Sequence, residues 1–99
     1  MIGVKEVVGL VETHITNPKL KKSIINKVSN VDNLFDACTI LRTDVVTSSH
    51  NDETGDEKVT ALAALVGVSD NAILATEDIT TGLKYINKYW SEQWVKNLH

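Results

Sequence analysis

Cysteine, proline and aromatic residues are scarce in this 99-residue chain. Because Cys38 is the only cysteine, the chain can form no internal disulfide and no cysteine-based metal cluster, which favours a reducing compartment. No stretch approaches the roughly 18 apolar residues that span a bilayer, and the first residues lack the basic segment and apolar run of a signal peptide. We therefore expect a cytoplasmic protein without a membrane segment.

The residue patterns that usually mark catalysis are also missing. The histidines His14, His50 and His99 have no metal-ligand spacing, and the acidic residues around His50 lack the order of a calcium-binding loop. Neither a glycine-rich phosphate loop nor a nucleophile elbow is present. Cys38 lies among apolar residues at helical spacing, which is typical of a buried thiol rather than a nucleophile. We expect neither enzyme activity nor a metal or cofactor.

Charge is distributed unevenly along the chain, whose net charge is −3. Residues 52–78 hold seven acidic residues against one lysine, a net charge of −6, and both flanking segments are slightly basic. The densest basic cluster comes earlier, at Lys19, Lys21, Lys22 and Lys27. Four lysines on a short helix usually form a solvated face, although such a cluster also suits an acidic partner or nucleic acid.

What the chain does have is enough apolar material, 42% of its residues, for one hydrophobic core. The apolar residues recur at helical spacing along most of the sequence. We therefore expect a single all-α domain over residues 1–99, a compact bundle of five or six helices. Helices are predicted at residues 3–15, 18–29, 33–42, 57–66 and 69–76, and from Asp78 onwards.

Each predicted helix has an apolar stripe that we expect to face the core. The stripe residues are Val4, Val7, Val8, Val11 and Ile15; Leu20, Ile24, Ile25 and Val28; Leu34, Phe35, Cys38 and Leu41; Val59, Leu62, Leu65 and Val66; and Ile79, Leu83, Ile86, Trp90 and Trp94. Asn17 and Pro18 predict a helix start, because asparagine caps helices and proline lacks a backbone donor. Gly82 is expected to weaken the last helix.

Two segments between the predicted helices are less regular. Residues 39–47 are rich in β-branched side chains, so a small α+β domain with a strand there is the alternative fold. Residues 47–56 have no apolar anchor and are predicted to form a polar loop.

Residues 62–73 contain a motif that is typical of two helices joined by a tight turn, Leu-Ala-Ala-Leu-Val-Gly-Val-Ser-Asp-Asn-Ala-Ile. A glycine at position 67 can end one helix in the left-handed conformation, and Ser69 can cap the next. The segment 57–78 resembles the helix-turn-helix of repressor and Cro-like regulators. The matching positions are Leu62, Ala63, Gly67, Val68, Ser69 and Ile73.

This resemblance implies a DNA-binding regulator whose second helix enters the major groove with Ser69 and Asn71. Lys19 and Lys22 would then supply nearby positive charge. The segment itself is acidic, whereas phosphate contacts supply most of the affinity of DNA-binding proteins. DNA binding is therefore the alternative function.

Tyr85, Tyr89 and Lys88 form the candidate partner-binding surface. Both tyrosines lie off the apolar stripe of the last predicted helix, so we expect them to be exposed, and tyrosine is enriched in protein interfaces. Together with the small size and acidic balance, they favour a non-enzymatic regulator or inhibitor that binds another protein. Small proteins of this kind are common in phages and mobile elements, which makes a viral origin our working hypothesis.

Overall fold

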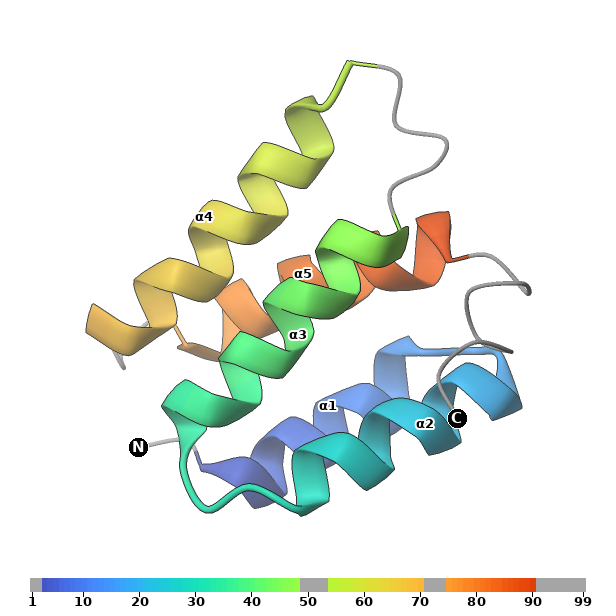
Figure 1. Cartoon of the computed structure of the whole chain (residues 1–99), viewed down its shortest axis with the longest axis vertical. Coiled ribbons are helices and arrows are strands. Elements are labelled where there is room, and N and C mark those ends of the chain that lie inside the picture. Colours follow the sequence, from blue (N-terminus) through green and yellow to red (C-terminus); the bar gives the residue numbers. More distant parts are fainter. Residues whose placement is uncertain (1–2, 49–53, 71–74, 91–99) are drawn as a thin grey trace.

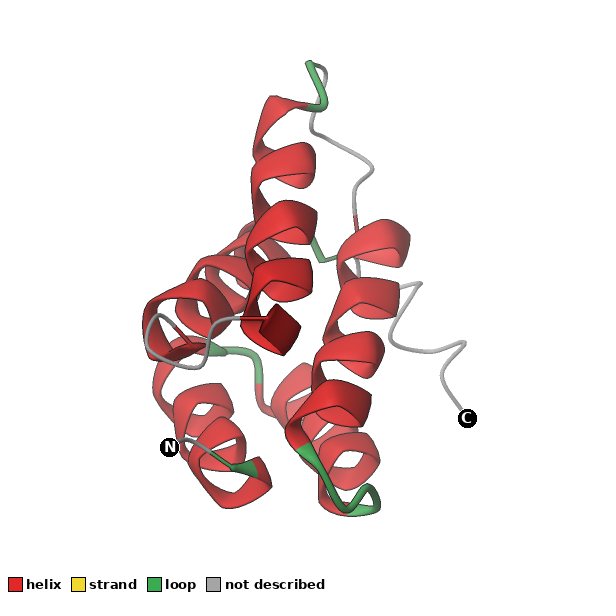
Figure 2. Ribbon diagram, turned by 90° about the vertical axis from the view of Figure 1, so that its left-hand side faces the viewer, coloured by secondary structure: helices red, strands yellow, loops and turns green. Residues whose placement is uncertain are grey.

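Five α-helices, and no strand, make up the part of the chain that the structure describes (Figure 2). The structure is a computed structural model and describes residues 3–48, 54–70 and 75–90. Its helices are α1 (Val4–His14), α2 (Pro18–Ser29), α3 (Leu34–Ser48), α4 (Asp56–Asp70) and α5 (Ala75–Tyr89). The prediction of an all-α fold is confirmed.

The first two helices begin where local side chains satisfy their free backbone donors. At the start of α1, the Gly3 N–H donates to Glu6 Oε2 at 3.0 Å. At the start of α2, Asn17 Oδ1 accepts from the N–H groups of Lys19 and Leu20 at 3.0 and 2.9 Å. Pro18 is the first residue of α2, so the predicted cap is confirmed.

The predicted third helix is longer than expected, and the alternative strand at residues 39–47 is wrong. Helix α3 runs through this segment to Ser48. The hydroxyls of Thr39, Thr43 and Thr47 each donate to the carbonyl four residues earlier, at 3.0 to 3.1 Å. Strand propensity is a weak preference, and here the burial of Leu41 and Val45 on one helical face outweighs it.

The predicted turn at Gly67 is also wrong, because α4 continues through Gly67 and Ser69 to Asp70. The predicted helix end at residue 66 is wrong, the first two residues of the predicted helix over 69–76 belong to α4 and its last two to α5, and residues 71–74 lie outside the described part. Helix α5 begins at Ala75 rather than Asp78. One glycine costs a helix only about 1 kcal/mol, and the burial of Val68 beyond it offsets that loss. The positive φ among the described residues is at Gly55, which precedes α4.

The buried core draws on all five helices. It comprises Val7, Val11, Ile15, Leu20, Ile24, Val28, Ala37, Cys38, Leu41, Val45, Ala61, Leu65, Val68, Ala75, Ile79, Leu83, Tyr85 and Ile86. Three predicted core residues are exposed instead: Phe35 by 56%, Val59 by 66% and Val66 by 47%. In α4 the buried stripe is Ala61, Leu65 and Val68. The helix is therefore rotated about its own axis, and it buries a different face from the one predicted.

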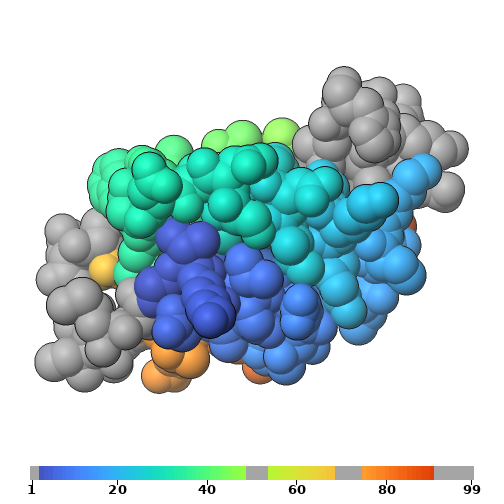
Figure 3. Space-filling model, turned by 90° about the horizontal axis from the view of Figure 1, so that it is seen from below, coloured from blue at the N-terminus to red at the C-terminus, as the bar shows by residue number. Residues whose placement is uncertain are grey.

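Helix α3 connects the two ends of the fold, because it contacts each of the other four helices. Helices α1 and α2 lie side by side, and α4 packs against α5 (Figure 1). Seen from below in Figure 3, α1, α2 and the start of α3 form one face. Thr16, between α1 and α2, donates its N–H to Asn87 Oδ1 of α5 at 2.8 Å. No described helix is long and apolar enough to cross a membrane.

Candidate partner-binding site

Helices α4 and α5 run antiparallel, and two contacts define how they pair. At one end, Lys88 Nζ of α5 lies 3.0 Å from Glu57 Oε1 of α4. Further along, Gly82 lies against Leu65, and a Cβ at position 82 would be only 2.8 Å from Leu65 Cδ1. Gly82 was expected to weaken its helix, and the structure gives it a second role, because it lets the two helices approach closely.

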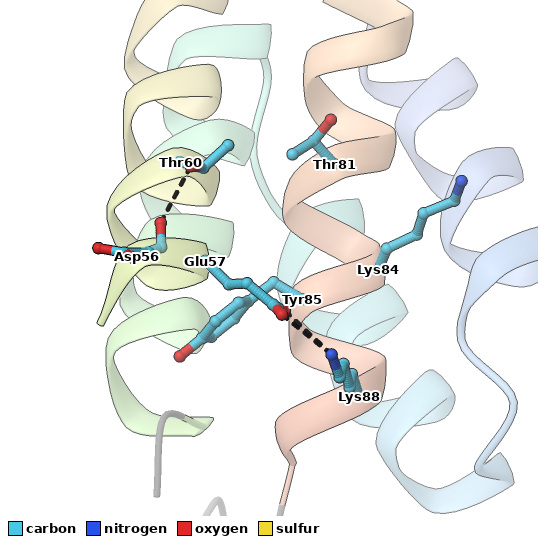
Figure 4. A pocket seen from close by; sticks show the side chains of 7 residues that line it. All are labelled: Asp56, Glu57, Thr60, Thr81, Lys84, Tyr85 and Lys88. Carbon is cyan, nitrogen blue, oxygen red and sulfur yellow. Dashed lines mark hydrogen bonds and ion pairs between the residues drawn. The ribbon is translucent and has the colours of Figure 1, made fainter. Parts of the chain in front are cut away.

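A pocket of 340 Å³ opens between α4 and α5 towards the end where the ion pair lies (Figure 4). Helix α4 contributes two acidic side chains and a threonine, and α5 contributes a threonine, two lysines and a tyrosine. The lining residues are Asp56, Glu57, Thr60, Thr81, Lys84, Tyr85 and Lys88. Of these, Tyr85 and Lys88 were predicted site residues. The others share no local motif, because they come from two helices that only the fold brings together.

The three predicted partner-binding residues do lie together, but they differ in exposure. Tyr85 is only 4% exposed, which corrects the expectation of an exposed ring. Its ring centroid is 4.7 Å from that of half-buried Tyr89, and Lys88 Nζ lies 5.0 Å from the Tyr89 centroid. Hydrogen bonds to Glu57 and then Tyr89 raise the pKa of the exposed Lys88 ammonium. Lys88 and Tyr89 are therefore the accessible members.

The outer surface of α4 adds exposed apolar residues beside this pocket. Val59 and Val66 are seven residues apart, which is two turns of a helix, so they lie on one face. At 100° per residue, exposed Ala63 falls between these valines and the pocket residue Thr60. One continuous surface of α4 thus runs from the pocket to the two valines.

The described residues among those predicted to contact DNA belong to two different helices. Lys19 and Lys22 are exposed on α2, which packs against α1 and α3, whereas Ser69 belongs to α4, which packs against α3 and α5. Asn71 lies outside the described residues. Because the local geometry required by the resemblance is absent at Gly67 and Ser69, DNA binding stays a prediction without a structural argument in its favour.

An ion pair between a buried carboxylate, Asp44, and a partly exposed lysine, Lys27, was not predicted from the sequence. Asp44 of α3 is 2% exposed, and its Oδ1 accepts from Lys27 Nζ of α2 at 2.6 Å. Burial raises the pKa of the Asp44 carboxyl, and Lys27 opposes that shift. Asp44 follows the apolar residue Leu41 at helical spacing, which was the available signal, but the predicted helix ended at residue 42 whereas α3 continues to Ser48.

Metal and thiol chemistry receive no support from the described part of the chain. Within it, no three His, Cys, Asp or Glu residues are grouped to hold a metal ion. Cys38 is buried as predicted, and burial raises the pKa of its thiol to about 11. A thiol with this pKa is almost entirely protonated at neutral pH. His50 and His99 lie outside the described residues, as does Trp94.

Comparison with known proteins gives no relative: no protein-family model, no curated protein and no solved structure matches this chain.

Proposed function

We propose that this protein binds another protein through α4 and the pocket between α4 and α5, and that it acts as a regulator or inhibitor of that partner. The observation that carries the proposal is the exposure of Val59 and Val66 next to the pocket. A contiguous apolar surface bordered by polar residues marks many protein interaction sites.

The polar residues beside the valines suit the rim of such an interface. The side chains of Glu57 and Lys88 are both exposed, and an exposed ion pair contributes little to stability. A partner can therefore compete for either charge without disrupting the fold. Tyr89 is half-buried beside Lys88 and offers an aromatic surface at the same edge.

Site-specific photo-crosslinking tests this proposal in cells that naturally make the protein. A photoreactive amino acid at Ala63 should give one dominant adduct, and the same amino acid at Glu12 on α1 should not. The adduct at position 63 should be lost in the double variant V59S/V66S and kept in the control K5S/K22S, which changes exposed residues of α1 and α2. Equal adducts at both positions, or an adduct that survives V59S/V66S, would reject α4 as the binding surface.

A further inference from the structure

The large apolar side chains that are exposed in the described part of the chain belong to two neighbouring helices. Phe35 and Val46 are on α3, with exposed fractions of 56% and 50%, and Val59 and Val66 are on α4. Helices α3 and α4 pack directly against each other and lie side by side in Figure 1. The side of each helix from which these residues project decides whether they form one surface.

On α3 the exposed apolar residues lie on the side that faces away from α2. Asp44 marks the α2 side, because its carboxylate accepts from Lys27 Nζ of α2. At about 100° per residue, Val46 lies about 200° around the helix axis from Asp44, and Phe35 lies within about 20° of Val46. Helix α4 packs against α3 and lies on the other side of α3 from α2 in Figure 1. Phe35 and Val46 therefore border α4.

On α4 the two valines lie on the side that faces away from the pocket. Val59 is about 200° around the helix axis from the pocket residue Glu57, and half-buried Leu62 falls between Val66 and the core. Because α5 forms the other wall of the pocket and α3 is the other helix that packs against α4, the valines border α3. Together with Arg42, which follows Phe35 by two turns, these residues form the α3–α4 face: Phe35, Arg42, Val46, Val59, Leu62 and Val66.

Arg42 gives this face a positive charge that is held in place. Its guanidinium carbon lies 5.7 Å from the centroid of the Phe35 ring, and its Nη2 donates to Thr39 Oγ1 at 2.8 Å. No ion pair among the described residues involves Arg42. Since a guanidinium has five donors, Arg42 can still bind a carboxylate that approaches the face.

The size of the α3–α4 face suits one further helix. Each of the two helices has 15 residues, so they are about 22 Å long and, with their side chains, about 20 Å wide together. Two copies of the chain that met through faces of roughly 400 Å² each would bury only about half the area of a typical stable interface. A single amphipathic helix laid along α3 and α4 can contact both, as helices do when they bind to apolar surfaces of other proteins.

We propose that an amphipathic helix of the partner packs on the α3–α4 face and places an acidic side chain beside Arg42, a proposal that rests on the proposed function. Apolar residues three and four positions apart form one stripe on such a helix, and this stripe covers the aromatic ring and the valines. A carboxylate can accept two parallel hydrogen bonds from a guanidinium, so Arg42 fixes the position of the helix along the face. Aromatic residues and arginine are also enriched in protein interfaces.

Photo-crosslinking from both helices of the face identifies the segment that binds there. A photoreactive phenylalanine analogue at Phe35 and a photoreactive amino acid at Ala63 should form adducts with the same segment of one partner. Sequencing of the crosslinked peptide should show apolar residues at helical spacing and an acidic residue beside them.

The crosslinked segment, made as a peptide of about 15 residues to match the length of the face, tests the role of Arg42. The variant R42Q should bind this peptide about threefold to fivefold more weakly than the wild-type protein, as expected for an exposed charge pair. The control K22Q, which changes an exposed lysine of α2, should bind it as the wild type does. A peptide in which lysine replaces the acidic residue should bind R42E more tightly than the wild-type protein.

The proposal of a partner helix has several ways to fail. An adduct between position 35 and a second copy of this chain would make the face a self-association surface. A crosslinked segment without an apolar stripe, or equal affinity of R42Q and the wild-type protein, would also reject it. An adduct from position 63 without one from position 35 would reject the α3–α4 face and leave the proposed function intact, whereas the absence of both adducts would reject the proposed function itself.

Discussion

Asp44 is a buried carboxylate whose surroundings favour its neutral form. Only Oδ1 is bonded to Lys27, and Oδ2 is buried without a hydrogen-bond partner among the described residues. Burial raises the pKa of Asp44 more than Lys27 lowers it. In the folded state the carboxyl therefore holds its proton more tightly than in the unfolded chain, and its contribution to stability falls as pH rises.

Replacing Asp44 by asparagine should remove this pH dependence. Above about pH 4, the ordinary pKa of aspartate, the wild-type protein should progressively lose free energy of unfolding relative to D44N. Below that pH the difference should be constant, because both side chains are then neutral. Urea unfolding of both proteins at a series of pH values measures this difference in the free energy of unfolding. A difference that changes in the opposite direction with pH would show that Lys27 dominates the pKa of Asp44.

Lys27 should matter mainly through Asp44. The variant K27M leaves a carboxylate in a site that is 2% exposed, and we expect a loss of about 1–3 kcal/mol at neutral pH. The double variant K27M/D44N leaves no buried charge and should recover most of that loss. Chemical unfolding of the four proteins gives the coupling energy directly. Simple additivity of the two single changes would mean that the ion pair contributes nothing specific.

At the scale of helix pairs, the contact between Gly82 and Leu65 sets how closely α4 and α5 approach. A Cβ at position 82 would be 2.8 to 3.0 Å from three side-chain carbons of Leu65. We expect G82A to destabilise the protein by about 1–2 kcal/mol, in spite of alanine's better helix propensity. At Gly9 in α1 nothing lies within 4 Å, so G9A should stabilise by about 0.5–1 kcal/mol. Thermal unfolding that ranks the two variants in the reverse order would contradict this helix contact.

The continuity of α4 through Gly67 makes a prediction that separates the two interpretations of residues 57–78. A Cβ at position 67 would meet only Asp78 Oδ2, at 4.0 Å, and the backbone there is helical. G67A should therefore stabilise the protein by about 0.5–1 kcal/mol. In a helix-turn-helix, where this glycine would adopt a positive φ, the same change would destabilise. A lower unfolding midpoint for G67A would restore that interpretation.

These helices also show which features the sequence could predict. The start of α2 depends on Asn17 and Pro18, which act on their immediate neighbours, and it was predicted correctly. The end and rotation of α4 depend on α5. Two apolar stripes are available in α4, and the one that includes Ala61 is buried because small residues such as Gly82 allow close contact.

The candidate site was only partly predictable for the same reason. Tyr85, Lys88 and Tyr89 could be placed near one another from the sequence because they belong to one helix. By its spacing, Tyr85 lies at the edge of the apolar stripe of α5, so the sequence predicted an exposed side chain. In the structure α4 packs against α5, and Tyr85 is buried. Asp56, Glu57 and Thr60 reach the pocket only through the pairing of α4 with α5, which no local pattern specifies.

For the molecule as a whole, the contacts of α3 predict one cooperative unfolding transition. Helix α3 touches the other four helices, and α1 also packs directly against α5. The bonds from Thr16 to Asn87 also join the α1–α2 turn to α5. A substitution that destabilises either helix pair should therefore promote unfolding of the whole protein, as in most single domains of this size.

The variants V7A in α1 and L83A in α5 test this coupling, since each truncates a fully buried side chain. We expect L83A to cost about 2–5 kcal/mol and V7A somewhat less. In each variant, native-state hydrogen exchange of amides in the cores of α1 and α5 should accelerate by the same factor, because both open only in global unfolding. Faster exchange confined to the mutated helix would show that the two helix pairs unfold independently, and the single-domain prediction would then be wrong.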